Sequence, residues 1–239
     1  MGTPITHSHD FFHPSLGKVH MIIRMNSRRI SAGWKNGVIH LNVPYGADSD
    51  TVIDALNHFA PNLLNSKSKL RYHDLQELHF DGLSIKIIRQ SIDPESVLGQ
   101  VRPNQSIISV GSKLKFNDDS TTRSISNIMC RIAKRVAPQI LIPRAEELAH
   151  SIGVKPSGWD ISTGHTIMGR CDSKGFILLS YMLVFVPQHL RDYIVCHELA
   201  HLTEMNHSPR FHQLCNQYCN GREAQLIKEM KEFKWPVLR

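Results

Sequence analysis

The stretch that decides the fold is Gln188–Met205, which reads QHLRDYIVCHELAHLTEM. Its apolar residues recur at helical spacing and cover more than one side, which predicts a helix in the centre of the fold. These residues are Leu190, Ile194, Val195, Leu199 and Leu202. Polar groups within such a helix need a chemical reason, and the histidines and the glutamate of this stretch suggest one.

The five residues His197-Glu198-Leu199-Ala200-His201 form a His-Glu-x-x-His motif. On a helix, residues four apart lie about 40° from each other, so the imidazoles of His197 and His201 can bind one ion. Glu198 projects beside them, where a carboxylate can take a proton from a water molecule on the metal without being a ligand. The motif therefore predicts a zinc site, with Glu198 as the catalytic base.

A catalytic zinc usually takes three protein ligands and leaves one position for water. We expect His207 to be the third, with Asn206 in the left-handed conformation turning the chain back. Ser208-Pro209 would then start the next helix as N-cap and first residue. Glu204 lies on the helix face of His201 and is the main rival: we expect its carboxylate to support the ligands, and the alternative is that it replaces His207. His212 is a weaker candidate.

Outside this stretch, the sequence predicts an α+β protein. Residues 1–17 show neither helical nor strand period and are expected to be a loose tail, although they contain His7, His9 and His13. Residues 18–115 alternate like half-buried strands, with an Asn36-Gly37 hairpin turn and one helix that begins near Asp48 and ends at Pro61. Residues 116–239 are expected to form a zincin-like catalytic domain with a small sheet. Its first helix should end or kink at Pro138 and Pro143. The sequence shows no internal repeat.

Composition limits the classes of protein that remain. With 41% hydrophobic and 21% charged residues in 239, the chain is neither disordered nor fibrous. The N-terminus has no cationic segment followed by an apolar core, so we expect a cytoplasmic protein that neither enters nor binds a membrane. Five cysteines without Cys-x-x-Cys spacing are expected to be reduced. The formal charge of +7, with an acid-free stretch between Asp10 and Asp48, allows weak nucleic-acid association through a basic surface. The oligomeric state is not encoded in any pattern.

The segment from Cys196 to Phe211, CHELAHLTEMNHSPRF, resembles the signature of the YgjP-like metallopeptidase family, which is related to the SprT-like zinc proteins. The upstream segment also resembles that family, at Thr166, Gly169, Cys171, Ser173, Lys174, Gly175, Ile177, Leu179 and Leu183. The resemblance implies a minimal zincin core, one zinc ion per chain on His197, His201 and His207, and Glu198 as base. The family is named for peptidases, while one bacterial member is described as a UTP pyrophosphatase.

The chain departs from that family where arginines are usual. Ile167 and Met168 stand in place of Arg-Trp, and Tyr181-Met182 in place of Trp-Arg. If those arginines hold an anionic substrate, two charge-assisted contacts are missing. Arg170 and Lys174 are the nearby candidates for substrate contacts. We therefore expect a zinc-dependent metallopeptidase, with a nucleoside triphosphate pyrophosphohydrolase of the UTP type as the alternative, and a nucleic-acid-associated zinc protein as the alternative from another class.

Overall fold

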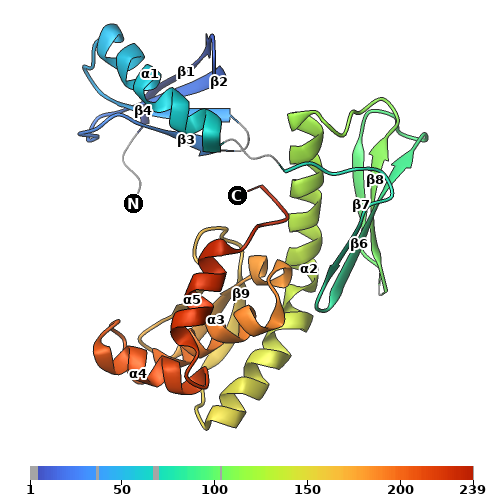
Figure 1. Cartoon of the computed structure of the whole chain (residues 1–239), viewed down its shortest axis with the longest axis vertical. Coiled ribbons are helices and arrows are strands. Elements are labelled where there is room, and N and C mark those ends of the chain that lie inside the picture. Colours follow the sequence, from blue (N-terminus) through green and yellow to red (C-terminus); the bar gives the residue numbers. More distant parts are fainter. Residues whose placement is uncertain (1–4, 36–37, 67–69, 103, 239) are drawn as a thin grey trace. The chain divides into compact units, whose positions relative to one another are not determined.

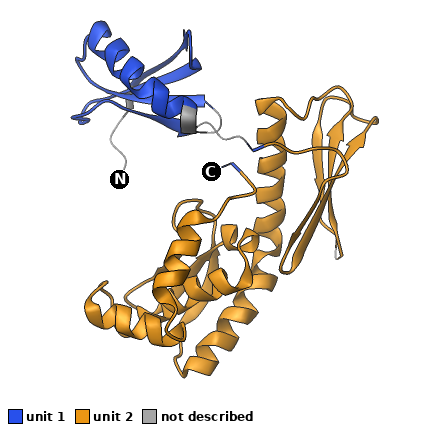
Figure 2. Cartoon of the chain, viewed as in Figure 1, with its two compact units in different colours: residues 1–70, 238–239 blue, residues 71–237 orange. Residues whose placement is uncertain are grey.

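We describe the fold from a computed structural model, which covers residues 5–35, 38–66, 70–102 and 104–238 (Figure 1). The chain has the expected mixed α and β composition. It divides into two compact units, residues 1–70 with 238–239, and residues 71–237 (Figure 2). The boundary therefore lies near residue 70, whereas we had expected it near residue 115.

Unit 1 is a four-stranded sheet with one helix. The strands are β1 (Ile5–His13), β2 (Gly17–Arg24), β3 (Ser31–Lys35) and β4 (Val38–Pro44), in the order β1-β2-β4-β3, and α1 (Ser49–Ser66) follows. The core contains Val19, Ile39 and Leu41 from the sheet and Leu56 from the helix. The helix continues through Pro61, since Leu63 beyond it is also buried in this core. The predicted turn at Asn36-Gly37 lies outside the described residues.

The prediction of a loose tail over residues 1–17 is wrong for β1. This strand pairs antiparallel with β2 along most of its length, from Ile5 opposite Arg24 to His13 opposite Gly17. Its side chains are mostly polar, so no alternating pattern marks it in the sequence. Backbone pairing and the packing of Phe11 against the core hold it in place instead.

Unit 2 begins with a second four-stranded sheet. It consists of β5 (Glu77–Phe80), β6 (Leu83–Gln90), β7 (Val97–Gln100) and β8 (Ser106–Gly111), in the order β5-β6-β8-β7, and α2 (Asp119–Ile152) follows. In both sheets the outer pairs are antiparallel, the central pair is parallel and a helix comes next. One connectivity thus occurs twice, although the sequence shows no repeat.

The second sheet belongs with α2 because the two pack closely. A Cβ at Gly99 of β7 would lie 2.3 Å from Cγ2 of Ile128 in α2, so the strand needs glycine there. This contact explains why residues 71–115 fold with the second unit. The helix α2 continues past Pro138 and Pro143, so the prediction that it could end at these prolines is wrong. Its C-cap is Gly153, which has the left-handed conformation.

The third sheet and the last helices form the rest of unit 2. The sheet has the order β10-β11-β9, with β9 (Gly158–Ser162), β10 (Gly169–Cys171) and β11 (Phe176–Ser180), so β10 is an edge strand. The 3-10 helix η1 (Tyr181–Phe185), α3 (Gln188–Ala200), α4 (Pro209–Tyr218) and α5 (Glu223–Glu232) follow. Among the described helices, none has both the length and the apolar character needed to cross a membrane.

Candidate metal centre

Three histidines converge at the C-terminal end of α3. His197 lies on the helix, His201 is its C-cap, and His207 lies in the loop before α4. One nitrogen from each lies within 4.8 Å of the other two, and the Nε2 atoms of His197 and His207 are 3.1 Å apart. Within the described residues, this is the cluster of side chains able to hold a metal ion.

The loop that brings His207 back is built partly as predicted. Ser208 is the N-cap of α4, its Oγ accepts a hydrogen bond from Phe211 N–H, and Pro209 begins the helix. The left-handed conformation predicted for Asn206 is wrong, because the described non-glycine residues with positive φ are Leu75 and Asn220. Instead, the helix ends early at Ala200. Backbone hydrogen bonds between residues three or four apart then turn the chain, including the bond from Thr203 N–H to Ala200 O.

His201 is oriented by the backbone of Glu204. Its Nδ1 lies 3.1 Å from the carbonyl oxygen of Glu204, and a carbonyl can only accept, so Nδ1 carries the proton. The Nε2 atom is then the free acceptor that a metal needs, which is the usual arrangement for a ligating histidine. The expected role of Glu204 thus falls to its backbone carbonyl. Its carboxylate does not belong to the histidine cluster.

Phe211 is a neighbour of the site that the sequence reasoning did not single out. Its side chain is fully buried, and its ring centre lies 4.8, 4.5 and 4.7 Å from those of His197, His201 and His207. It therefore forms the apolar wall against which all three imidazoles pack. Two features of the sequence point to it: it is the last residue of the segment that resembles the family signature, and it lies in the first turn of the helix that follows His207.

Glu198 lies beside the cluster against the edge strand β10. It is 5% exposed, and a Cβ at Gly169 would lie 2.4 Å from its Oε1. Burial raises the pKa of Glu198 to about 7, while a hydrogen bond from Cys171 N–H acts in the opposite direction. A group with such a pKa can accept and return a proton near neutral pH, and a bound cation would shift this pKa downward.

The imidazole of His197 is neutral at pH 7. Burial, together with the neighbouring His201 and His207, lowers the pKa of His197 to about 4. Burial likewise lowers the pKa of His201. A neutral imidazole is the form that binds a metal ion, so these two buried side chains favour a bound cation.

The other predicted residues lie apart from this cluster. Gly169 contacts Glu198, and successive residues of a strand point to opposite faces, so the exposed Arg170 side chain points to the other face. Lys174 is exposed in the turn between β10 and β11. His212 does not join the cluster, since its Nδ1 lies 2.8 Å from Oε1 of the buried Glu223.

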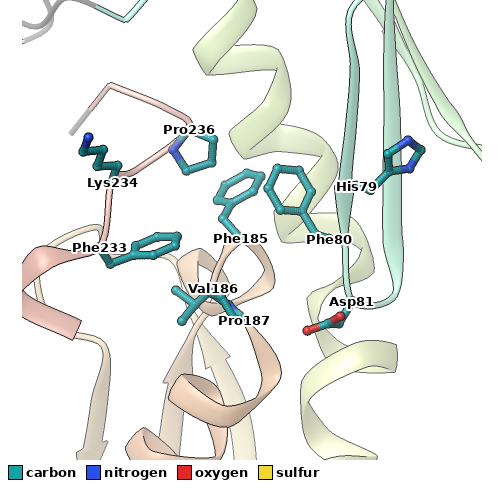
Figure 3. Close-up of a pocket in the computed structure, with 9 residues that line it drawn as sticks. All are labelled: His79, Phe80, Asp81, Phe185, Val186, Pro187, Phe233, Lys234 and Pro236. Carbon is teal, nitrogen blue, oxygen red and sulfur yellow. The ribbon is translucent and has the colours of Figure 1, made fainter. Parts of the chain in front are cut away.

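A separate pocket of about 290 Å³ lies at the opposite, N-terminal end of α3 (Figure 3). Phe80, Phe185 and Phe233 form its walls, and Lys234 and Asp81 lie at its rim. The Asp81 carboxylate already has a hydrogen-bond partner within the protein, because it accepts a hydrogen bond from Gln188 N–H at the start of α3. This pocket contains none of the clustered histidines, so the candidate metal centre is a distinct place in unit 2.

A helix with a His-Glu-x-x-His motif and a third histidine returning to the same point is the arrangement of a metal-dependent hydrolase. The chain belongs to the YgjP-like family, whose metallopeptidase domain matches residues 28–231. This membership confirms the resemblance noted in the sequence, and it implies a metal and a metallopeptidase-type hydrolase. Comparisons with curated proteins and with solved structures found no match.

Proposed function

We propose that this protein is a zinc-dependent metallopeptidase, with His197, His201 and His207 as the ligands and Glu198 as the general base. The observation that carries the proposal is the spacing of the imidazole nitrogens. Two ligands about 2.0–2.1 Å from a tetrahedral zinc ion are about 3.3 Å apart, and the Nε2 atoms of His197 and His207 are 3.1 Å apart. Three imidazole ligands with an open fourth position favour zinc over hard cations such as Mg²⁺.

Zinc bound there would supply Lewis-acid polarisation of a water molecule and of the scissile carbonyl group. Residues of the chain transfer the protons and position the ligands. Glu198 takes the proton of the attacking water and can return it to the leaving amine, which its pKa near 7 favours. The Glu204 carbonyl keeps His201 in the correct tautomer, and Phe211 keeps the three rings in place.

The edge strand β10 supports a peptide as the substrate. A strand at the edge of a sheet has unpaired backbone groups that can bind an extended chain as an additional strand. Cys171 N–H, on the outer side of β10, donates to the Glu198 carboxylate. A peptide lying along this edge would therefore pass directly beside the proposed base.

A nucleotide is supported less well. Its phosphates need cationic partners near the metal. Ile167 is an exposed apolar residue where the family usually has arginine, Met182 is buried, and Arg170 lies on the far face of its strand. None of these candidate positions therefore places a cationic group beside Glu198, as a nucleoside triphosphate pyrophosphohydrolase would need.

The test compares two substrate classes with one zinc-loaded preparation. Unfolded protein and peptide libraries are incubated with the wild type and with Glu198→Gln, and cleavage is followed by mass spectrometry. Pyrophosphate release from nucleoside triphosphates is measured in parallel. We expect peptide cleavage by the wild type and a loss of about 10²- to 10⁴-fold in Glu198→Gln, which should still bind one zinc ion. Pyrophosphate release that disappears in Glu198→Gln would instead assign the site to nucleotides.

A further inference from the structure

The sheet of unit 1 has a helix on one side only. Successive residues of a strand point to opposite faces, and the buried Val19 and Leu41 lie on the face that packs against α1. Strand pairing places His20 opposite Asp10 of β1 and opposite His40 of β4, and these three residues lie on the other face. Since α1 is the single helix among the described residues of unit 1, no helix of the unit covers this second face, which we call the open face.

The open face presents aromatic rings. Phe12 is two residues beyond Asp10 on β1, so it lies on the same face, and it is 77% exposed. His20 and His40 lie side by side, with their ring centres 4.9 Å apart, and the His20 side chain is 32% exposed. The bases of a single-stranded nucleic acid stack on such rings, because every base has a π-face. The open face thus offers two places where a base can stack.

The open face is also on the basic side of the unit. Lys18 lies opposite Phe12, and 62% of its side chain is exposed. Arg24 lies on the same face at the end of β2. The segment from β2 to β3 then continues with Arg28 and Arg29, which are both exposed. Cations therefore lie beside the rings and beyond the end of the same strand.

The acidic residues of the unit lie mostly on the covered side. Residues 1–70 contain four acids. Three of them lie on α1 or just before it, and they are Asp48, Asp50 and Asp54. The fourth, Asp10, lies on the open face, where it pairs with Lys18 at 2.7 Å and with His20. The side that carries the rings therefore has a net positive charge, which is complementary to phosphate groups.

We propose that the open face of unit 1 binds single-stranded nucleic acid. The rings of Phe12 and of the His20–His40 pair stack on bases, and Lys18 and Arg24 contact phosphates. A single strand fits this face better than a duplex, because the bases of a duplex are paired and stacked on one another and cannot turn onto protein rings. This binding does not depend on the metal centre, so the proposed hydrolysis and the proposed binding can fail separately.

The test measures binding to the full chain and requires no activity assay. Fluorescence anisotropy is recorded with labelled single strands of RNA and of DNA, each about 12 nucleotides long, with the corresponding duplexes, and with heparin as a competing polyanion that has no bases. We expect the single strands to bind more tightly than the duplexes. The logarithm of the binding constant should fall with the logarithm of the salt concentration at a slope of about −2, as about three phosphate contacts would give.

The wild-type titrations can overturn the proposal. Binding of either RNA or DNA supports it, and the tighter of the two identifies the ligand. Absence of binding to single strands, equal affinity for duplexes, or full displacement by heparin at equal charge would each contradict it, because the rings would then make no contribution.

Matched substitutions locate the site. Phe12→Ala should weaken binding at least about fivefold, the lower end for the loss of stacking on one base, whereas Ile53→Ala, at an exposed apolar residue of α1, should not. Asp10→Asn should strengthen binding about three- to fivefold, because it removes the acid from the open face. Asp54→Asn makes the same change of charge on α1 and should have little effect.

The predicted gain of affinity in Asp10→Asn keeps the test independent of folding, since a damaged fold would weaken binding. Equal effects of Asp10→Asn and Asp54→Asn, or unchanged binding in Phe12→Ala, would place the nucleic acid elsewhere and overturn the proposal.

Discussion

Gly169 and Glu198 are in such close contact that a methyl group on Gly169 would lie 2.4 Å from Oε1 of Glu198. Gly169 does not have a positive φ, so its backbone would accept alanine. Glycine is needed at this position because of the side chain opposite it. The edge strand β10 thereby determines where the proposed base lies.

The first prediction concerns this contact. Gly169→Ala should push Glu198 out of place and reduce hydrolysis by about 100-fold, since displacements near 1 Å have such effects. Zinc content should stay at one ion per chain, because the histidines are not moved. Gly33→Ala is the matched control, since a Cβ there meets nothing within 4 Å. Unchanged hydrolysis in Gly169→Ala would show that Glu198 acts from another position.

The second prediction separates the two candidates for the third ligand. His207→Ala should weaken zinc binding by more than about 100-fold, the upper range for groups that only orient ligands. Glu204→Ala should bind zinc nearly as well as the wild type, because its carbonyl, which holds His201, is retained. A competition titration with a chromophoric chelator measures both affinities. The reverse order of effects would make Glu204 the ligand.

A third prediction concerns Phe211. Phe211→Ala removes a fully buried ring and should lower the free energy of unfolding by about 3–5 kcal/mol. It should also weaken zinc binding, because the ring packs against all three imidazoles. Phe185→Ala, at the other end of α3, should destabilise the fold without changing zinc affinity. Urea unfolding and the chelator titration together test this, and equal zinc affinities in the two variants would contradict it.

The fourth prediction concerns how the stability of the fold depends on pH through Asp172, a residue outside the histidine cluster. The Asp172 carboxylate accepts hydrogen bonds from the backbone N–H groups of Phe176 and Lys174, which lower its pKa below the usual value. Because the folded-state pKa is lowered, the ionised group stabilises the fold above the unfolded pKa of about 3.9, and this is lost as the pH falls through the folded value. Asp172→Asn keeps an acceptor but no charge. The Tm of the wild type should exceed that of Asp172→Asn at pH 7, and the difference should close below about pH 4; a difference that persists in acid would argue against the charge.

The sequence predicted the clustering of His197, His201 and His207 because most of its geometry is local. The spacing of His197 and His201 places both on one face of a helix, and Ser208-Pro209 starts the next helix, as the structure shows. It predicted the path between them less well. Asn206 does not turn as expected, since the early end of α3 at Ala200 turns the chain by backbone hydrogen bonds that no residue type encodes.

By itself, then, the sequence determined the class of chemistry and the order of the elements, since residue type and helical period act over a few neighbouring positions. Only the tertiary structure decided which groups meet across long separations. It placed Gly169 against Glu198 and the polar strand β1 beside β2. It also showed one sheet connectivity used twice, because strand pairing depends on backbone hydrogen bonds and burial, which different sequences can satisfy equally.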